Sequence, residues 1–154
     1  MKTVTDPEEK LTIQEVARRS GLAESTLRYY EQIGLIAPIE RDRRSKHRRY
    51  SPTTAEVIEI LACLRAAGMG IADMRSYLEN MKRGKNAAGD QRALFERHRD
   101  RVKEQIEILQ KQQAYLDAKV VLWSAREQND TSQEMEAIKV LQHMAKELRD
   151  HGDS

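Results

Sequence analysis

Two short segments near the start of the chain carry apolar residues at helical spacing. The first spans residues 13–20. Thr12 lies just before it and Glu15 in its first turn, at the spacing of a capping box. Gly21 follows, which suits a left-handed C-cap. The second spans residues 24–33 and ends at a glycine; its apolar face is Leu27, Tyr30 and Ile33. Two short helices joined by a tight turn predict a helix-turn-helix.

The next segment predicts a hairpin followed by two more helices. Two short extended stretches flank a charged tip at residues 41–50 and would form a wing. Ser51 and Pro52 then match an N-cap and the first position of a helix. Its apolar positions are Val57, Ile58, Leu61 and Leu64. A fourth short helix carries Ile71, Met74, Tyr77 and Leu78. We therefore expect one domain over residues 11–82, followed by a linker at 83–89.

Residues 90–128 contain neither glycine nor proline and predict one long helix. Apolar residues recur every seven positions, with a second, interleaved series interrupted by Arg99 and Gln113. The predicted dimerisation residues are Phe95, Val102, Ile106, Leu109, Leu116, Val120 and Trp123. Such a seam favours a two-chain coiled coil, and its polar members would help to fix the register. The alternative is a helix packed on its own domain. Residues 129–154 add a last amphipathic helix and a tail.

Composition excludes several classes of protein. Hydrophobic residues make up 39% of the 154 residues and aromatic residues only 5%, which suits helices that bury one stripe each or a chain that dimerises. No apolar run reaches the length of a membrane span, and the N-terminus lacks a secretion signal, so we expect a cytoplasmic protein without a membrane partner. We also expect no cofactor and no enzyme, because no catalytic grouping is recognisable.

Charge is concentrated in the predicted wing. Residues 41–50 hold six Lys/Arg and one acid, a local charge of +5 against +2 for the whole chain. A charge run of this kind can be a solvated loop, but it also matches a phosphate-binding surface. Four histidines (His47, His98, His143 and His151) and a single cysteine do not give the spacing of a metal site, so no metal is expected.

Two stretches resemble a known family. Residues 12–22 read TIQEVARRSGL and residues 26–36 read TLRYYEQIGLI, and Arg48, Arg49 and Tyr50 continue the match. This sequence resembles the N-terminal signature of MerR-family transcription regulators. The resemblance covers about residues 11–82 by motif and the long helix by architecture alone. It implies a mainly α fold, in which a winged helix-turn-helix DNA-binding domain precedes a long antiparallel coiled-coil dimerisation helix.

The resemblance also implies partners and site residues. A homodimer would bind double-stranded DNA at a two-fold symmetric operator, with RNA polymerase as a further partner at the promoter. By the family pattern Arg28 and Tyr30 face the DNA and Tyr29 packs inward, although Tyr30 can also be read as a core residue. The predicted DNA-binding residues are Ser25, Arg28, Tyr30, Arg41, Arg43 and Arg48. Ala23 departs from the Ser or Thr that many members carry there, so the recognition helix lacks a side-chain N-cap.

The effector is open from sequence. Cys63 and the nearby Gly68 and Met69 resemble the branch that responds to aldehydes and electrophiles through one cysteine. Cys63 could equally be an inert apolar residue. A third reading is a hydrophobic ligand held between the long helix and the last helix, next to Trp123, Tyr115 and the Met stripe. Two other classes stay open: an architectural or excision factor with a MerR-like head, and a structural coiled-coil adaptor.

Overall fold

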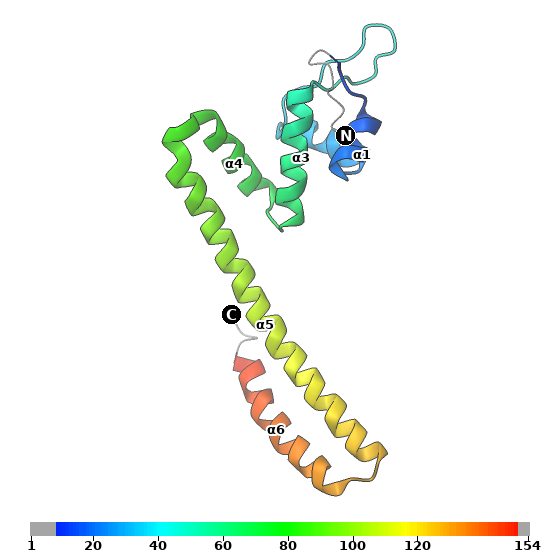
Figure 1. The fold of residues 1–154 in the computed structure, drawn as a ribbon, viewed down its shortest axis with the longest axis vertical. Coiled ribbons are helices and arrows are strands. Elements are labelled where there is room, and N and C mark those ends of the chain that lie inside the picture. The colour runs from blue at the N-terminus through cyan, green and yellow to red at the C-terminus, as the bar shows by residue number, and fades with distance from the viewer. Residues whose placement is uncertain (1–8, 151–154) are drawn as a thin grey trace, which may run out of the picture. The chain divides into compact units, whose positions relative to one another are not determined.

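The computed structural model describes residues 9–150, which divide into two compact units on either side of Leu94 and Phe95. Helices dominate both units (Figure 1). Within this range the extended segments form only isolated bridges. The mainly α class, with a helix-turn-helix head and a long helix, is confirmed. The helices are α1 (Ile13–Ser20), α2 (Glu24–Gln32), α3 (Pro52–Ala66), α4 (Ile71–Arg83), η1 (Gly84–Ala87), α5 (Ala88–Glu127) and α6 (Thr131–Asp150).

Local chemistry sets the ends of the first helices. The Thr12 side chain accepts a hydrogen bond from the Glu15 backbone N–H at 3.2 Å, and the Glu15 carboxylate accepts one from the Thr12 N–H at 2.8 Å. This capping box starts α1, and Gly21 ends it with a φ of 73°. Ser51 caps α3 with its side chain alone, which accepts from the Thr54 N–H at 3.1 Å, and Pro52 lies in the first turn. The predicted caps of α1 and α3 are therefore confirmed.

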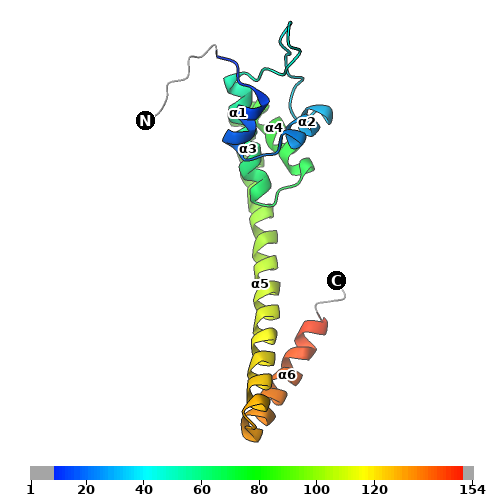
Figure 2. The same ribbon diagram turned by 90° about the vertical axis from the view of Figure 1, so that its right-hand side faces the viewer.

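The core of the first unit lies where α1, α2, α3 and α4 meet. Side chains from each of these helices and from the base of the wing are buried together. The largest fully buried side chains are Val16, Leu27, Tyr50, Ile58, Leu61 and Met74. Figure 2 shows α1 and α2 beside α3 and α4 in this unit. The core thus fixes the position of α2 and leaves its outer face exposed.

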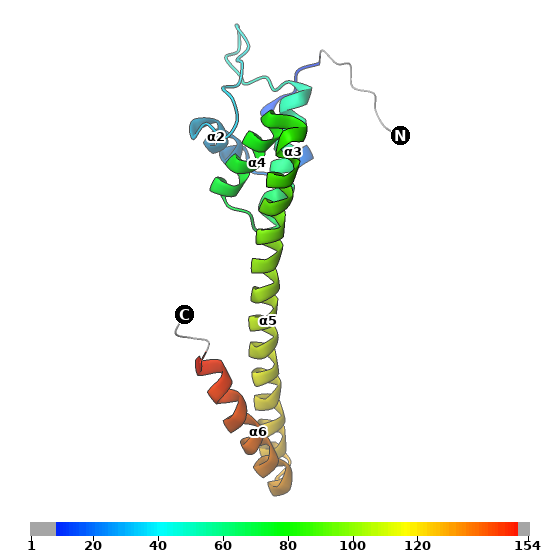
Figure 3. The same ribbon diagram turned by 90° about the vertical axis from the view of Figure 1, so that its left-hand side faces the viewer.

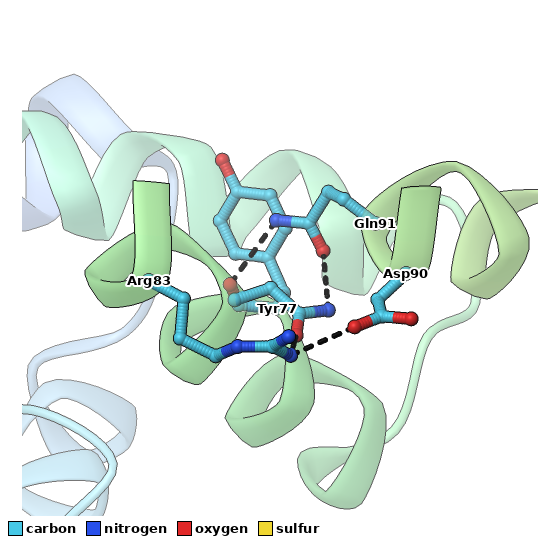
Figure 4. A network of polar contacts seen from close by, with 5 residues as sticks. Tyr77, Arg83, Asp90 and Gln91 are labelled. Carbon is cyan, nitrogen blue, oxygen red and sulfur yellow. Dashed lines mark hydrogen bonds and ion pairs between the residues drawn. The ribbon is translucent and has the colours of Figure 1, made fainter. Parts of the chain in front are cut away.

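Residues 83–89, expected as a linker, form a tight helical turn instead. Gly84 ends α4 with a φ of 67°, and η1 leads directly into α5, with Ala87 buried. Side chains from both helices then close the junction (Figure 4). Gln91 donates to the Tyr77 carbonyl at 3.1 Å, and Arg83 pairs with Asp90 at 2.8 Å. The expected linker is therefore wrong, because hydrogen bonds between α4 and the first turn of α5 hold the segment in place.

The second unit is a helical hairpin. α6 turns back and runs beside the C-terminal part of α5 (Figures 2 and 3). Leu122 on α5 is buried with Ala137 and Leu141 on α6, and Tyr115 and Ala118 pack at the edge of this cluster. None of the helices within residues 9–150 combines the length and the apolarity needed to cross a lipid bilayer.

Candidate nucleic-acid interface

Helix α2 presents one buried face and one exposed face. Leu27 and Tyr30 point into the core, and Tyr30 is only 2% exposed. Tyr29 is 49% exposed. The expected orientation of this tyrosine pair is therefore wrong: Tyr30 packs inward and Tyr29 faces outward. Residues next to each other on a helix lie about 100° apart, so only one of the two can share the face of Leu27.

Arg28 and Ser25 lie on the exposed face of α2, as expected. The Arg28 guanidinium pairs with Glu24, one turn earlier, at 3.1 Å. Both side chains are largely exposed, so the pair is weak and can exchange for a stronger anion. Ala23 precedes the helix without a side-chain cap, as the sequence predicted. The first turn of α2 thus offers backbone N–H groups and one guanidinium to an anion.

The wing is a narrow hairpin stabilised by backbone hydrogen bonds. The Asp42 N–H donates to the His47 carbonyl at 2.8 Å, and Arg41 forms an antiparallel bridge with Arg48. The Asp42 carboxylate accepts from the N–H groups of Arg44 and Ser45 at 3.0 and 2.8 Å. These hydrogen bonds lower the pKa of Asp42. The carboxylate therefore stays ionised and organises a tip that otherwise carries only positive charge.

Lys46 closes the tip in a left-handed conformation, with a φ of 62°. A non-glycine residue rarely adopts this backbone geometry. Arg41 donates to the Lys46 carbonyl at 3.3 Å, which braces the turn. Arg41 and Arg43 are both exposed, so their guanidinium groups are accessible to phosphate.

Arg48 has a different environment from the other wing arginines. Its Nε donates to the Glu31 carboxylate at 2.7 Å, and the side chains of the two residues are only 19% and 16% exposed. The other Glu31 oxygen accepts from the Ile39 N–H at 2.6 Å. Burial alone would raise the pKa of Glu31, but these two hydrogen bonds and the charges of Arg48 and Arg41 outweigh it and lower the pKa. The ion pair therefore connects α2 to the base of the wing.

The start of α1, the start of α2 and the wing enclose a hollow of about 230 Å³. Its lining is strongly cationic and includes one acid, Glu24. The basic residues around it are Arg28, Arg41, Lys46, His47, Arg48 and Arg49. The structure thus brings Arg28, Arg41 and Arg48 around one hollow, whereas Arg43 stands at the wing tip and Ser25 lines a neighbouring hollow. A phosphate group matches the charge of this hollow.

Two contacts that support α2 could not be read from the sequence. The Arg75 guanidinium on α4 donates to the Ile33 carbonyl at the end of α2, at 2.5 Å. Arg65 on α3 donates to the Thr26 hydroxyl at 3.4 Å. Both pairs are distant in sequence, and neither belongs to a local motif. They fix the two ends of α2 to α3 and α4.

The other predicted site residues lie away from the wing. Cys63 is exposed on α3. In the second unit the expected seam is also exposed: Leu109 and Leu116 are each 61% accessible. Trp123 is 61% accessible, so it does not line a closed pocket within one chain. Within residues 9–150, His, Cys, Asp and Glu side chains nowhere gather in a group of three that could hold a metal ion. His151 lies outside the described residues.

Comparison with known proteins agrees with this geometry. The profile of the MerR HTH family regulatory proteins matches residues 11–81, and that of the MerR DNA-binding region matches residues 56–119. A Haemophilus influenzae HTH-type transcriptional regulator of uncharacterised role is 30% identical over 106 residues, which are 69% of this chain and 76% of that protein. The chain belongs to the MerR family.

Two further relatives define what the family match covers. The HTH-type transcriptional regulator AdhR of Bacillus subtilis is 40% identical over 67 residues, which are 44% of this chain and 47% of AdhR. The chain thus matches about half of AdhR. The structure of HiNmlR, a MerR-family regulator lacking the sensor domain and bound to promoter DNA, aligns with a TM-score of 0.58 at 27% identity. That alignment covers 77% of this chain and 94% of HiNmlR.

This MerR-family chain is a DNA-binding transcriptional regulator and not an enzyme. Its helix-turn-helix and wing lie within the matched residues 11–81. The family motif correctly located α2 and the wing. It did not identify Tyr29 as the exposed tyrosine, and it did not reveal the ion pair between Glu31 and Arg48.

Proposed function

We propose that the protein is a dimeric regulator that binds a two-fold symmetric operator and changes promoter geometry in response to an effector. The observation that carries the proposal is the cationic hollow between α2 and the wing, where Arg28 and Arg41 converge. A related MerR-family regulator whose structure contains promoter DNA supports this reading. As a regulator of transcription it would act in the cytoplasm, beside RNA polymerase at the promoter.

In this proposal α2 lies in the major groove and the wing contacts the backbone outside it. Arg28 can direct its planar guanidinium at a base edge or a phosphate. Ser25 and the exposed Tyr29 lie on the same helix and add hydroxyl donors. Arg41 and Arg43 neutralise phosphates, so binding should weaken steeply with salt. Arg48 acts mainly through Glu31, by fixing the wing relative to α2.

The dimer is proposed from the long helix. Leu109, Leu116 and Val120 lie on an exposed apolar stripe that no part of the second unit covers. A second chain would bury this stripe and bring two heads onto one operator. Two heads held together can bend the DNA between their half-sites, which costs several kcal/mol and therefore needs contacts at both ends.

The dimer is tested by placing charges in the stripe. Leu109→Asp combined with Leu116→Asp should give monomers in sedimentation and remove most operator affinity. Ile108→Asp is the matched control, because Ile108 is an exposed apolar residue outside the seam, at 45% accessibility. It should remain dimeric and bind DNA. A dimeric Leu109/Leu116 variant would show that the chains associate elsewhere.

Cys63 is the proposed effector-sensing residue. Its thiol is exposed on α3, so an electrophile can reach it. With an α,β-unsaturated aldehyde, the thiolate sulfur would form a bond to the β-carbon. The electron pair of the carbon–carbon double bond would then take up a solvent proton at the α-carbon. The adduct adds bulk to α3, the helix that also contacts Thr26 on α2 through Arg65.

The sensing role is tested by promoter output with and without such an aldehyde. Cys63→Ser should abolish induction and leave operator binding intact, while mass spectrometry of the wild-type protein should show one adduct at Cys63. Full induction in Cys63→Ser would exclude covalent sensing and favour a non-covalent hydrophobic effector. Loss of operator binding in Cys63→Ser would instead mean that the residue is structural.

A further inference from the structure

Helix α5 has two opposite apolar faces in the second unit, and α6 covers only one of them. The covered face carries Tyr115, Ala118 and Leu122. Leu116 and Val120 lie on the other side of the helix and are 61% and 68% exposed. With about 3.6 residues per turn, these two sets point in opposite directions. The exposed stripe is therefore not the surface against which α6 packs.

A second copy of this chain fits the stripe best, because the stripe and its flanking charges complement themselves when the helix is reversed. In an antiparallel pair, each residue on one side of the seam meets a residue from the other series of the partner. Only two registers bury most of the seam, and they differ by a shift of one heptad. The charged and polar residues that flank or interrupt the seam distinguish between them.

We propose that two α5 helices pair antiparallel in one specific register, in which Val102 packs against the partner's Val120 and Ile106 against the partner's Leu116. Leu109 then meets the partner's Gln113 on either side of the two-fold axis. This inference rests on the proposed dimer and goes beyond it, since it assigns which residues face each other.

The end of the seam supports this register. Here Arg99 faces the partner's Trp123, whose ring is 61% exposed and already carries Arg126 at 4.7 Å from its centroid. A guanidinium over an indole is a favourable cation–π arrangement. The polar interruption at Arg99 thus gains a partner that an aliphatic residue would not provide.

The charged residues that flank the seam also favour the proposed register. Lys103 comes to lie opposite the partner's Asp117, and this ion pair occurs twice because of the two-fold symmetry. In the alternative register Glu96 faces the partner's Asp117, so two acids repel each other. That register also places Arg99 against the aliphatic side chain of the partner's Leu116, whereas Gln113 faces an aliphatic residue in both registers. Charges beside a coiled-coil seam commonly select partner and orientation.

Cross-linking tests the register in the Cys63→Ser protein, which has no other thiol. Gln112 faces its own copy across the two-fold axis in the proposed register, so Gln112→Cys should cross-link efficiently with a short bismaleimide. Gln105→Cys is the matched control. Its two copies would be separated by about 20 Å along the helix axis, from the ~1.5 Å rise per residue. It should not cross-link with itself.

The outcomes separate the register from the dimer itself. If mixed Gln105→Cys and Gln112→Cys chains cross-link to each other better than Gln112→Cys does to itself, the alternative register is correct and the proposed one is overturned. If sedimentation shows monomers, the proposed dimer fails as well. A charge reversal adds an independent readout. Lys103→Glu should weaken dimerisation about tenfold, and adding Asp117→Lys should restore it. No rescue would count against the register.

Discussion

The guanidinium Nε of Arg48 lies 2.7 Å from a carboxylate oxygen of Glu31, and both side chains are mostly buried. This contact joins the base of the wing to the penultimate residue of α2. Arg48, which the family pattern assigns to DNA binding, therefore stabilises the position of the wing relative to α2. Arg28, Arg41 and Arg43, the other basic residues proposed to contact DNA, are exposed.

Glu31→Gln should destabilise the head at neutral pH by about 1–3 kcal/mol, because it removes a charged hydrogen-bond acceptor from a largely buried pair. The pKa of Glu31 is lowered in the folded state from its ordinary value of 4.5. Its stabilisation is therefore complete above about pH 4.5 and is lost as the pH falls below that value. Urea unfolding of both proteins at pH 7 and at pH 3.5 measures this. The difference between them should shrink at the lower pH.

A matched control for this experiment is Glu40→Gln. Glu40 also pairs with a cation, Lys10, and its pKa is also lowered, but both side chains are largely exposed. It should change stability less than Glu31→Gln does. Equal losses of stability from the two substitutions would mean that the mostly buried Glu31–Arg48 pair has no special role in holding the wing.

The two tyrosines of α2 should separate stability from DNA binding. Tyr30→Ala leaves a cavity in the core and should cost about 3–5 kcal/mol of stability. Tyr29→Ala removes an exposed ring and should change stability by no more than about 0.5 kcal/mol, while lowering operator affinity. Thermal unfolding and fluorescence anisotropy with operator DNA measure the two effects. Loss of affinity in the mild variant Tyr30→Phe, with Tyr29→Ala unaffected, would restore the original assignment of Tyr30 to the DNA.

Replacing Arg28 and replacing Arg41 should lower DNA affinity in different ways, one depending on the DNA sequence and the other on the salt concentration. Arg28→Ala should cost about 1–3 kcal/mol of specific binding if the residue reads a base edge. Arg28→Lys should recover little of it, because lysine lacks the planar fork. Arg41→Ala should weaken all sequences alike and reduce the salt slope by about one. Lys139→Ala, on α6, is the charge control and should change neither. If the Arg28→Ala and Arg41→Ala variants showed the same sequence dependence and the same salt slope, the assignment of Arg28 to a base edge and of Arg41 to phosphate would be contradicted.

Much of the head could be predicted because its signals are local. The capping box at Thr12 and Glu15 and the cap at Ser51 each involve residues within one helical turn. The spacing of Leu27 and Tyr30 also placed Tyr30 on the buried face, and only the family pattern turned it outward. The apolar period was the better guide, because burial depends on the neighbours that α2 has in this chain.

The rest of the head depends on pairs that are far apart in sequence. Glu31 and Arg48 are brought together by the path of the wing, and Arg75 reaches Ile33 only after α3 and α4 have packed. Nothing in the local sequence marks these partners. The junction at residues 83–89 was misread for a similar reason: its glycines and charges are typical of a linker, but Tyr77 and Gln91 close it.

Ala23→Ser should stabilise the head by about 1 kcal/mol, because it adds the side-chain cap that α2 lacks. Ala23 already has the extended backbone of an N-cap, with φ −66° and ψ 147°, so a serine hydroxyl can reach the N–H groups of the first turn without rearrangement. Ala23→Val, which offers no oxygen, should give no such gain. Operator affinity should stay unchanged, since the hydroxyl adds no charge near Arg28. Thermal unfolding and anisotropy measure both quantities. A serine variant no more stable than the valine variant would mean that the first turn of α2 already has adequate hydrogen-bond partners in solvent.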